Sequence, residues 1–251
     1  MPRLRHLWLG TVPYRDAWEM QRRLALARAA GEIDDCLLLL EHPPVYTVGR
    51  GGDPAHLGDG PAALRALGAE CIEVDRGGSV TFHGPGQLVG YPILGLARAF
   101  PIPGSPGRGD AVAYVRALER ALIATAARQG VVAGRRPGMS GAWVGPNKLA
   151  AIGVKLARGV TQHGVALNVT TDLGWFAHVT PCGIEDGGVT SLAAEGAFGL
   201  TTRVVGEDFA ACLAEAIGAS LEASGPDLAR LAAAPAGAGP SRAGGAAPVA
   251  V

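Results

Sequence analysis

The feature that most limits how this chain can fold is the alternation of short apolar segments with glycine and proline. In the second half, residues 142–144, 148–154 and 165–169 are rich in small and apolar residues and are bounded by glycine or proline. Such segments, separated by turn-forming residues, are typical of antiparallel strands joined by short connections. Four earlier segments have the same character and are also expected to be strands: 37–40, 45–48, 71–74 and 79–82.

Three segments have the spacing of amphipathic helices. In residues 111–129 the apolar side chains recur at i, i+3, i+4 and i+7, with Asp110 placed as the N-cap and Gly130 as the C-terminal stop. Residues 14–30 and 206–222 carry similar patterns. Because strands and helices are mixed without a regular strand–helix alternation, the pattern predicts an α+β fold with a mixed, mostly antiparallel sheet flanked by helices.

The composition divides the chain into a folded part and a tail. The 251 residues are enough to bury a substantial core, and apolar periodicity continues to about residue 222. Beyond that point alanine, glycine and proline dominate, and such a segment buries too little surface to offset its ordering entropy. We therefore expect a single folded domain over residues 1–222 and a disordered, low-complexity tail over residues 223–251.

Charge and hydropathy exclude several classes of function. The 22 basic and 22 acidic residues give a formal net charge of zero, so there is no global basic field for nucleic acid. The strongest apolar run, at 36–40, is far too short to span a bilayer, and no secretory signal pattern is present at the start. We expect a cytoplasmic protein that binds neither nucleic acid nor membrane.

One of the four cysteines has a distinctive setting. Cys36, Cys71, Cys182 and Cys212 are widely separated, which argues against both a disulfide framework and a zinc site. A lone cysteine is usually a buried, inert thiol. Cys182, however, lies in the sequence Thr180-Pro181-Cys182-Gly183, which predicts a turn. A thiol on a turn near a cation is the setting in which the thiolate is favoured.

The candidate cation is Lys148, one of only two lysines beside 20 arginines. A lysine at the head of an apolar strand is usually a solvated strand end. Here it stands out, because an ammonium can approach a thiol closely and can lose a proton, whereas a guanidinium cannot be deprotonated. We expect Lys148 and Cys182 to be the catalytic residues, with no metal and no organic cofactor.

Three glycine-containing segments are candidates for substrate binding. Glycine lets a backbone approach a ligand and expose its N–H groups, although a lone Gly-Gly pair is more often an ordinary hairpin turn. Small residues on strands also leave room for an aliphatic chain, and His163, at the start of the third segment, is by itself more often structural than catalytic. The candidate binding residues are Arg76, Gly77, Gly78, Ser79, Val80, Thr81, Phe82 and His83 in the first segment, Ala151, Ile152 and Gly153 in the second, and Gly164, Val165 and Ala166 in the third.

Taken together, these segments resemble those of the lipoyl(octanoyl) transferases. The matching residues are 41–47, 76–92, 148–154, 161–169 and 181–184, and the resemblance extends over about residues 1–222. Ser79 stands where family members vary among polar residues, and the tail lies outside the pattern. The resemblance implies the fold of the biotin and lipoate protein ligase catalytic domains. By position, it also implies an acyl-thioester on Cys182, tuned by Lys148, and acyl binding by the three segments.

The activity that the resemblance implies is transfer of an octanoyl group from octanoyl-acyl carrier protein to a lysine on a lipoyl domain. The implied acceptors are the lipoyl domains of 2-oxoacid dehydrogenase complexes and the glycine cleavage H protein. Three alternatives remain open at this point: an ATP-dependent lipoate or biotin ligase, a non-catalytic acyl- or lipoyl-domain-binding module, and a cysteine thioesterase. A ligase would need ATP and no cysteine, a binding module would tolerate loss of Cys182, and a thioesterase would pass the acyl group to water.

Overall fold

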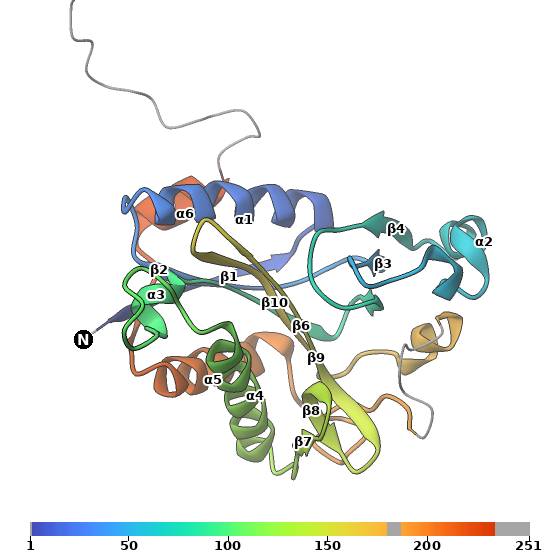
Figure 1. The fold of residues 1–251 in the computed structure, drawn as a ribbon. Coiled ribbons are helices and arrows are strands. Elements are labelled where there is room, and N and C mark those ends of the chain that lie inside the picture. Colours follow the sequence, from blue (N-terminus) through green and yellow to red (C-terminus); the bar gives the residue numbers. More distant parts are fainter. Residues whose placement is uncertain (1, 180–186, 234–251) are drawn as a thin grey trace, which may run out of the picture.

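A central eight-stranded sheet organises the molecule, and a three-stranded sheet lies beside it (Figure 1). The computed structural model describes residues 2–179 and 187–233. The large sheet has the order β11-β1-β2-β6-β10-β9-β8-β7 and the small one β4-β3-β5. The strands are β1 (Arg3–Thr11), β2 (Asp35–Glu41), β3 (Val45–Val48), β4 (Glu70–Glu73), β5 (Val80–His83), β6 (Gln87–Ile93), β7 (Gly134–Arg136), β8 (Met139–Val144), β9 (Asn147–Ala157), β10 (Val160–Asn168) and β11 (Ser220–Ala223).

Helices cover both faces of the large sheet. Figure 1 shows α1 and α6 on one face and α4 and α5 on the other, with α2 beside the small sheet. The α-helices are α1 (Tyr14–Ala29), α2 (Gly60–Ala66), α3 (Leu96–Ala99), α4 (Ala111–Arg128), α5 (Thr202–Ala216) and α6 (Pro226–Ala233), and two 3₁₀ turns occur at Pro54–His56 and Leu173–His178. The predicted α+β class, with a mixed sheet flanked by helices, is confirmed.

The helix α4 begins as its sequence predicts. The Asp110 carboxylate accepts hydrogen bonds from the backbone N–H groups of Val112 and Ala113, which would otherwise lack partners at the helix start. One face of α4 then packs into the core between α5 and the sheet, with Leu118 and Leu122 fully buried. The expected helix at 206–222 instead starts at Thr202 and ends at Ala216, because Thr201 caps it and the chain then turns into β11.

The antiparallel connection of β8, β9 and β10 is the part of the sheet that carries the candidate site. Their expected antiparallel pairing is confirmed: β9 lies between β8 and β10. In the small sheet, β4 and β5 flank the Gly77-Gly78 turn but do not pair with each other. Instead β3 lies between them, parallel to β4 and antiparallel to β5.

The chain remains structured beyond the expected domain boundary at residue 222, so the prediction of a disordered segment is wrong for residues 223–233. Strand β11 pairs with β1 in parallel, and α6 packs on α1 with Leu228 and Ala232 buried. The guanidinium of Arg5 holds the carboxylate of Asp227 with two hydrogen bonds of 2.8 and 2.5 Å. Buried apolar residues, the Arg5–Asp227 pair and a hydrogen bond from Arg23 to the carbonyl oxygen of Ala232 therefore help to dock this alanine-rich segment. Residues 234–251 lie outside the described part.

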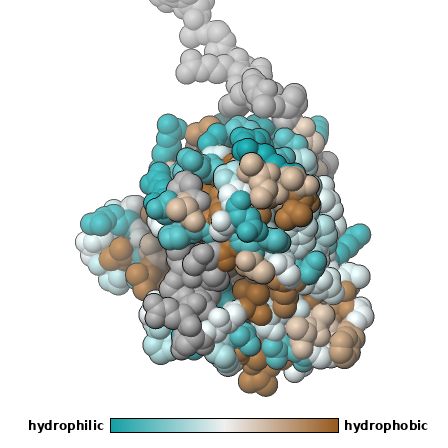
Figure 2. All heavy atoms as spheres, turned by 90° about the vertical axis from the view of Figure 1, so that its right-hand side faces the viewer, coloured by the Kyte–Doolittle hydropathy of each residue, from teal (hydrophilic) through white to brown (hydrophobic). Residues whose placement is uncertain are grey.

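The surface carries no extended apolar belt on the face that Figure 2 shows. Hydrophobic side chains reach this face as separate patches among hydrophilic ones. Among the described residues, no helix combines the length and the hydropathy needed to cross a membrane.

Candidate active site

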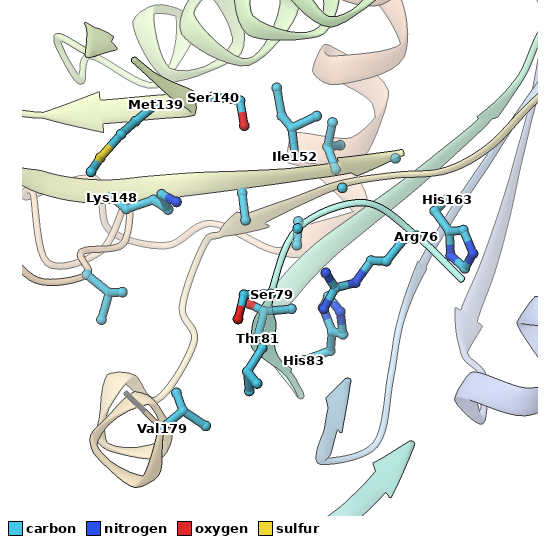
Figure 3. Close-up of a pocket in the computed structure, with 18 of the residues that line it drawn as sticks. Arg76, Ser79, Thr81, His83, Met139, Ser140, Lys148, Ile152, His163 and Val179 are labelled. Atoms are coloured by element: carbon cyan, nitrogen blue, oxygen red, sulfur yellow. The ribbon is translucent and has the colours of Figure 1, made fainter. Parts of the chain in front are cut away.

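A cavity of about 380 Å³ lies between the β9–β10 pair, the start of β5 and the N-terminus of α1 (Figure 3). Its size is in the range of small-molecule sites in enzymes. The lining combines small apolar residues with a few polar and charged groups. The lining residues are Tyr14, Arg76, Gly78, Ser79, Val80, Thr81, His83, Tyr91, Gly138, Met139, Ser140, Lys148, Ala151, Ile152, Gly153, His163, Gly164, Val165, Ala166, Phe176, Val179 and Val189.

The structure brings most of the expected binding residues together at this cavity. Members of all three sequence segments line it, as does Lys148. Two expected residues do not. Gly77 instead donates its N–H to the carbonyl oxygen of Val154 and so ties its turn to β9. Phe82 points into the core of the small sheet, where it stacks on Trp175 with ring centroids 5.2 Å apart.

The register of β9 against β10 explains the small residues along the cavity. Gly153 pairs with Gly164, and Ala151 pairs with Ala166, so small residues face each other across the two strands. At Gly164 the absence of a side chain is required, since a Cβ there would lie 2.1 Å from the carbonyl oxygen of Gly90 on β6. The small residues of β9 and β10 also line the cavity, where they leave room for an aliphatic chain.

Lys148 is held in place by its backbone and by an aromatic ring. Its N–H donates to the carbonyl oxygen of Gly188, and its own carbonyl accepts from the N–H of Thr190. The Lys148 Nζ lies 4.8 Å from the centroid of the Trp143 ring, a cation–π distance. Burial and the nearby guanidinium of Arg136 lower the pKa of Lys148 from its ordinary value. The ammonium is therefore easier to deprotonate than a solvated one.

Cys182 lies outside the described residues. The chain on either side of it is placed, however, and both sides reach the cavity. Val179 lines the cavity before the segment 180–186, and Val189 lines it after that segment while forming a bridge to Lys148.

Arg76 is a buried cation at the cavity wall. Its Nη2 donates to the carbonyl oxygen and to the hydroxyl of Thr47, at 2.8 and 2.7 Å, and its Nη1 donates to the carbonyl oxygen of Gly77 at 3.0 Å. Its Nε is buried and has no hydrogen-bond partner within residues 2–179 and 187–233. Among the described residues no carboxylate forms a salt bridge with this guanidinium, so its charge is balanced only by neutral acceptors.

A hydrogen-bonded chain leads from the surface to Tyr14 in the cavity wall. The Nζ of Lys155 donates to Asp75 at 2.5 Å, and the other oxygen of Asp75 lies 2.9 Å from the Nε2 of His163. The Nδ1 of His163 faces the Tyr14 hydroxyl at 3.3 Å. Since carboxylates only accept, the neutral imidazole carries its proton on Nε2 and accepts from Tyr14 through Nδ1. His163 also has a backbone φ of +55°, a strained conformation for a residue with a side chain.

Two further histidines are fixed as neutral tautomers in the same way. The Nδ1 of His42 donates to the carbonyl oxygen of Val12 at 2.6 Å, so its Nε2 accepts from the Tyr91 hydroxyl at 2.8 Å. The Nδ1 of His83 donates to the Gln87 side-chain oxygen at 2.7 Å. Each histidine thus has a defined donor and a defined acceptor nitrogen.

Burial keeps these groups neutral near pH 7. It lowers the pKa of His42 to about 4, and it lowers the pKa of His163 to about 4 although Asp75 opposes the shift. Burial also lowers the pKa of His83 well below its ordinary value and raises the pKa of Tyr14 to about 12. Burial alone would raise the pKa of Asp75, but hydrogen bonds from Lys155 and His163 outweigh it and bring that pKa to about 2.

Sequence reasoning did not identify several cavity residues. Tyr14 was expected only as a helix residue, and its place at the start of α1, facing β10, is set by tertiary packing. The others were not singled out in the sequence, although Tyr91 lies within the matching segment 76–92. They are Tyr91, Gly138, Met139, Ser140, Phe176, Val179 and Val189. Within the described ranges, no cluster of three or more His, Cys, Asp or Glu side chains is arranged to hold a metal ion.

Comparison with known proteins places these observations in a family. A family model described as "Lipoyl protein ligase A/B catalytic domain" matches residues 13–217. The curated octanoyltransferase of Rubrobacter xylanophilus is 52% identical over 188 residues, which cover 74% of this chain and 80% of that protein. The octanoyltransferase of Mycobacterium marinum is 48% identical over 227 residues, which cover 87% of this chain and 88% of that protein.

Solved structures share the fold at much lower identity. Lipoate-protein ligase A bound with ATP matches with a TM-score of 0.70 and 16% identity, over 92% of each chain. A bipartite lipoate protein ligase from Thermoplasma acidophilum matches with a TM-score of 0.67 and 16% identity, over 92% of this chain and 91% of that one. At this level of identity the likeness shows the fold alone.

Proposed function

The chain belongs to the lipoyl protein ligase A/B catalytic-domain family, and from this premise we propose that it is an octanoyltransferase acting through a thioester on Cys182. The donor is octanoyl-acyl carrier protein, and the acceptor is a lysine of a lipoyl domain. The support comes from its octanoyltransferase relatives, about half identical over most of the chain, and from the cavity.

The observation that carries this proposal is the cavity, with Lys148 and small-residue strands in one wall. The paired small residues of β9 and β10 offer an apolar channel, and Lys148 precedes that channel on β9. Val179 lies three residues before Cys182, and three residues of extended chain span about 11 Å at most. A segment of that length is long enough for Cys182 to reach the same cavity, as the proposal requires.

The proposed reaction has two steps. In the first, the Cys182 thiolate attacks the carbonyl carbon of the donor thioester, a new C–S bond forms, and the carrier thiolate leaves and takes a proton. In the second, the neutral amine of the acceptor lysine attacks the octanoyl-Cys182 thioester, the C–N bond forms, and the Cys182 thiolate leaves. The amide is lower in free energy than the thioester, so no ATP is consumed. Backbone N–H groups near the glycine-rich turns are suited to stabilise the oxyanion.

Lys148 is suited to assist both steps. As an ammonium, it favours the Cys182 thiolate before the first step. Because its pKa is lowered by burial and by Arg136, it can exist as an amine and accept the proton that the attacking lysine releases. The cation–π contact with Trp143 supports this proposal, because it holds the Lys148 ammonium at the cavity.

We also propose the acceptor proteins of this reaction and the compartment in which it takes place. The acceptors are the lipoyl domains of 2-oxoacid dehydrogenase complexes and the glycine cleavage H protein, and the reaction takes place in the cytoplasm. No metal or organic cofactor takes part in either step.

A transfer assay tests this proposal against its rivals. Purified protein, octanoyl-acyl carrier protein and a lipoyl domain are combined without ATP, and the mass of the lipoyl domain is followed. We expect one octanoyl group to be added, and Cys182→Ser to abolish the addition. A requirement for ATP would instead support a ligase, and release of free octanoate at the same rate without acceptor would support a thioesterase.

A further inference from the structure

Arg76 has hydrogen-bonding capacity that the described residues 2–179 and 187–233 do not use. The side chain is buried, with only 7% of its surface exposed, yet it lines the cavity. Its five N–H groups include three whose acceptors are the hydroxyl and carbonyl of Thr47 and the carbonyl of Gly77. Within the described part of the chain the buried N–H of Nε has no partner, and Nη1 has one acceptor for its two N–H groups. An unpaired buried donor is costly, so the arrangement points to an acceptor that arrives with a ligand.

The groups around Arg76 do not supply that acceptor as a charge. His83 and His163 are neutral tautomers, and the hydroxyl hydrogens of Tyr14 and Tyr91 are committed to His163 and His42. Figure 3 shows the guanidinium of Arg76 beside His83, on the side of the cavity away from Lys148. The Arg76 side of the cavity is therefore polar and, among the described residues, has unpaired N–H donors. Between Arg76 and Lys148 the cavity is lined by Ala151, Val165 and Ala166.

Arg76 and Lys148 lie at different positions along β9. Arg76 packs against Gly153, where a Cβ would lie 3.0 Å from the Cδ of Arg76. Lys148 lies five residues earlier on the same strand, and a strand rises about 3.4 Å per residue, so the two backbone positions are about 17 Å apart. An acyl chain whose carbonyl reacts at the Lys148 end thus runs along small residues toward Arg76.

We propose that Arg76 recognises the far end of the acyl chain. Its guanidinium donates a hydrogen bond to an acceptor atom at the chain end and so favours such a chain over one that ends in a methyl group. This inference rests on the proposed octanoyl transfer. Chains that stop short of Arg76 end beside the small and apolar residues of β9 and β10. A methyl group that reaches Arg76 displaces water from the guanidinium and returns no hydrogen bond, whereas a hydroxyl or carbonyl oxygen replaces that water. Arg76 therefore limits the length of plain alkyl chains and admits longer chains that end in an acceptor.

Isosteric donor pairs test this on the wild-type protein. At each chain length, an acyl-carrier donor ending in a methyl group is compared with one ending in a hydroxyl at the same position, for example nonanoyl with 8-hydroxyoctanoyl. For short chains we expect the methyl member to have the higher kcat/KM, because a hydroxyl facing apolar residues is unpaired. At the length that reaches Arg76 the preference should reverse, by about tenfold in favour of the hydroxyl.

Replacing Arg76 tests whether its guanidinium causes the reversed preference for the hydroxyl-ended donor. Arg76→Met should remove the reversal and extend the range of alkyl chains that are transferred, while the matched control Arg128→Met, in the exposed last turn of α4, should keep it. If Arg76→Met does not fold, the donor pairs measured on the wild-type protein still test the inference. Preference for the methyl member at every transferred length would overturn the inference and leave octanoyl transfer intact. Failure to transfer any acyl chain would overturn the proposed function, and this inference with it.

Discussion

At the scale of single residues, Lys148 is the group that we propose for proton transfer. It combines partial burial, a cation–π contact with Trp143 and a lowered pKa, three features that an arginine at this position would not reproduce together. A chain of buried hydrogen bonds also holds the backbone of Lys148. The Gln87 amide donates to Asn168, whose own amide donates to the carbonyl oxygen of Thr190. Thr190 in turn binds the Lys148 backbone, so buried amides position the lysine.

Two substitutions of Lys148 separate charge from proton transfer. Lys148→Ala removes the cation, so the thiol pKa of Cys182 should rise and both steps should slow. Lys148→Arg keeps a cation that cannot accept a proton, so the thiol pKa should stay low while transfer to the amine is lost. The rate of alkylation by iodoacetamide against pH reports the thiol pKa, and single-turnover transfer reports the second step. Transfer by Lys148→Arg at the wild-type rate would show that Lys148 is only an electrostatic neighbour.

Asn168 and Asn147 both form hydrogen bonds with the segment 188–190, so their substitutions can be compared directly. Asn168→Asp loses the N–H that binds Thr190 and sets a carboxylate oxygen against a carbonyl, so kcat should fall by about tenfold or more, with a lower Tm. Asn147 only accepts, from the N–H of Gly188 at 3.0 Å, so Asn147→Asp keeps its hydrogen bond and should retain both kcat and Tm. Equal effects of the two substitutions would contradict the positioning role of Asn168.

At the scale of elements, patterns with a strong local cause were predictable. The strand Val45–Val48 and the α4 start at Asp110 occur where the sequence predicted them, because β-branched residues and an N-cap act locally. The positions of Arg76, Ala151 and Gly164 along one cavity were also expected. What the sequence did not reveal depends on packing between distant elements, such as Tyr14 facing His163 or the docking of α6 on α1.

The docking of α6 leads to a prediction at this scale. Truncation after Ser224 removes the buried Leu228 and Ala232 and the Arg5–Asp227 pair, so Tm should fall by several degrees. Leu228→Ala alone should cost about 2–3 kcal/mol of unfolding free energy. Truncation after Ala233 removes only the alanine-, glycine- and proline-rich remainder and should leave Tm unchanged. Thermal unfolding of the three variants decides, and equal Tm for both truncations would show that α6 adds no stability.

At the scale of the whole molecule, the buried neutral histidines couple folding to pH. The unfolded chain protonates its histidines below about pH 6.5, whereas His42 and His163 in the folded chain protonate only near pH 4. The unfolded state therefore binds more protons between these values. Stability is fully present above pH 6.5 and is lost as the pH falls toward 4.

This linkage has a measurable size. At pH 5 each of these two histidines should cost about 2 kcal/mol of unfolding free energy relative to pH 7. Urea unfolding across this range should show the loss, and His42→Gln, which has no titrating ring, should show a shallower dependence on pH. An unfolding free energy that does not change between pH 7 and pH 5 would contradict the buried, neutral assignment.

The proposed transfer requires a covalent octanoyl-Cys182 intermediate, and mass spectrometry detects such an intermediate most directly. Cys36 and Cys212 are buried, and burial raises the pKa of Cys36 to about 12, so neither is set up as a nucleophile. Protein incubated with octanoyl-acyl carrier protein, without acceptor, should gain one octanoyl group. Peptide mapping should place it on Cys182, neutral hydroxylamine should release it, and Cys182→Ser should not acquire it. An equally labile octanoyl group on another cysteine of Cys182→Ser would contradict the account.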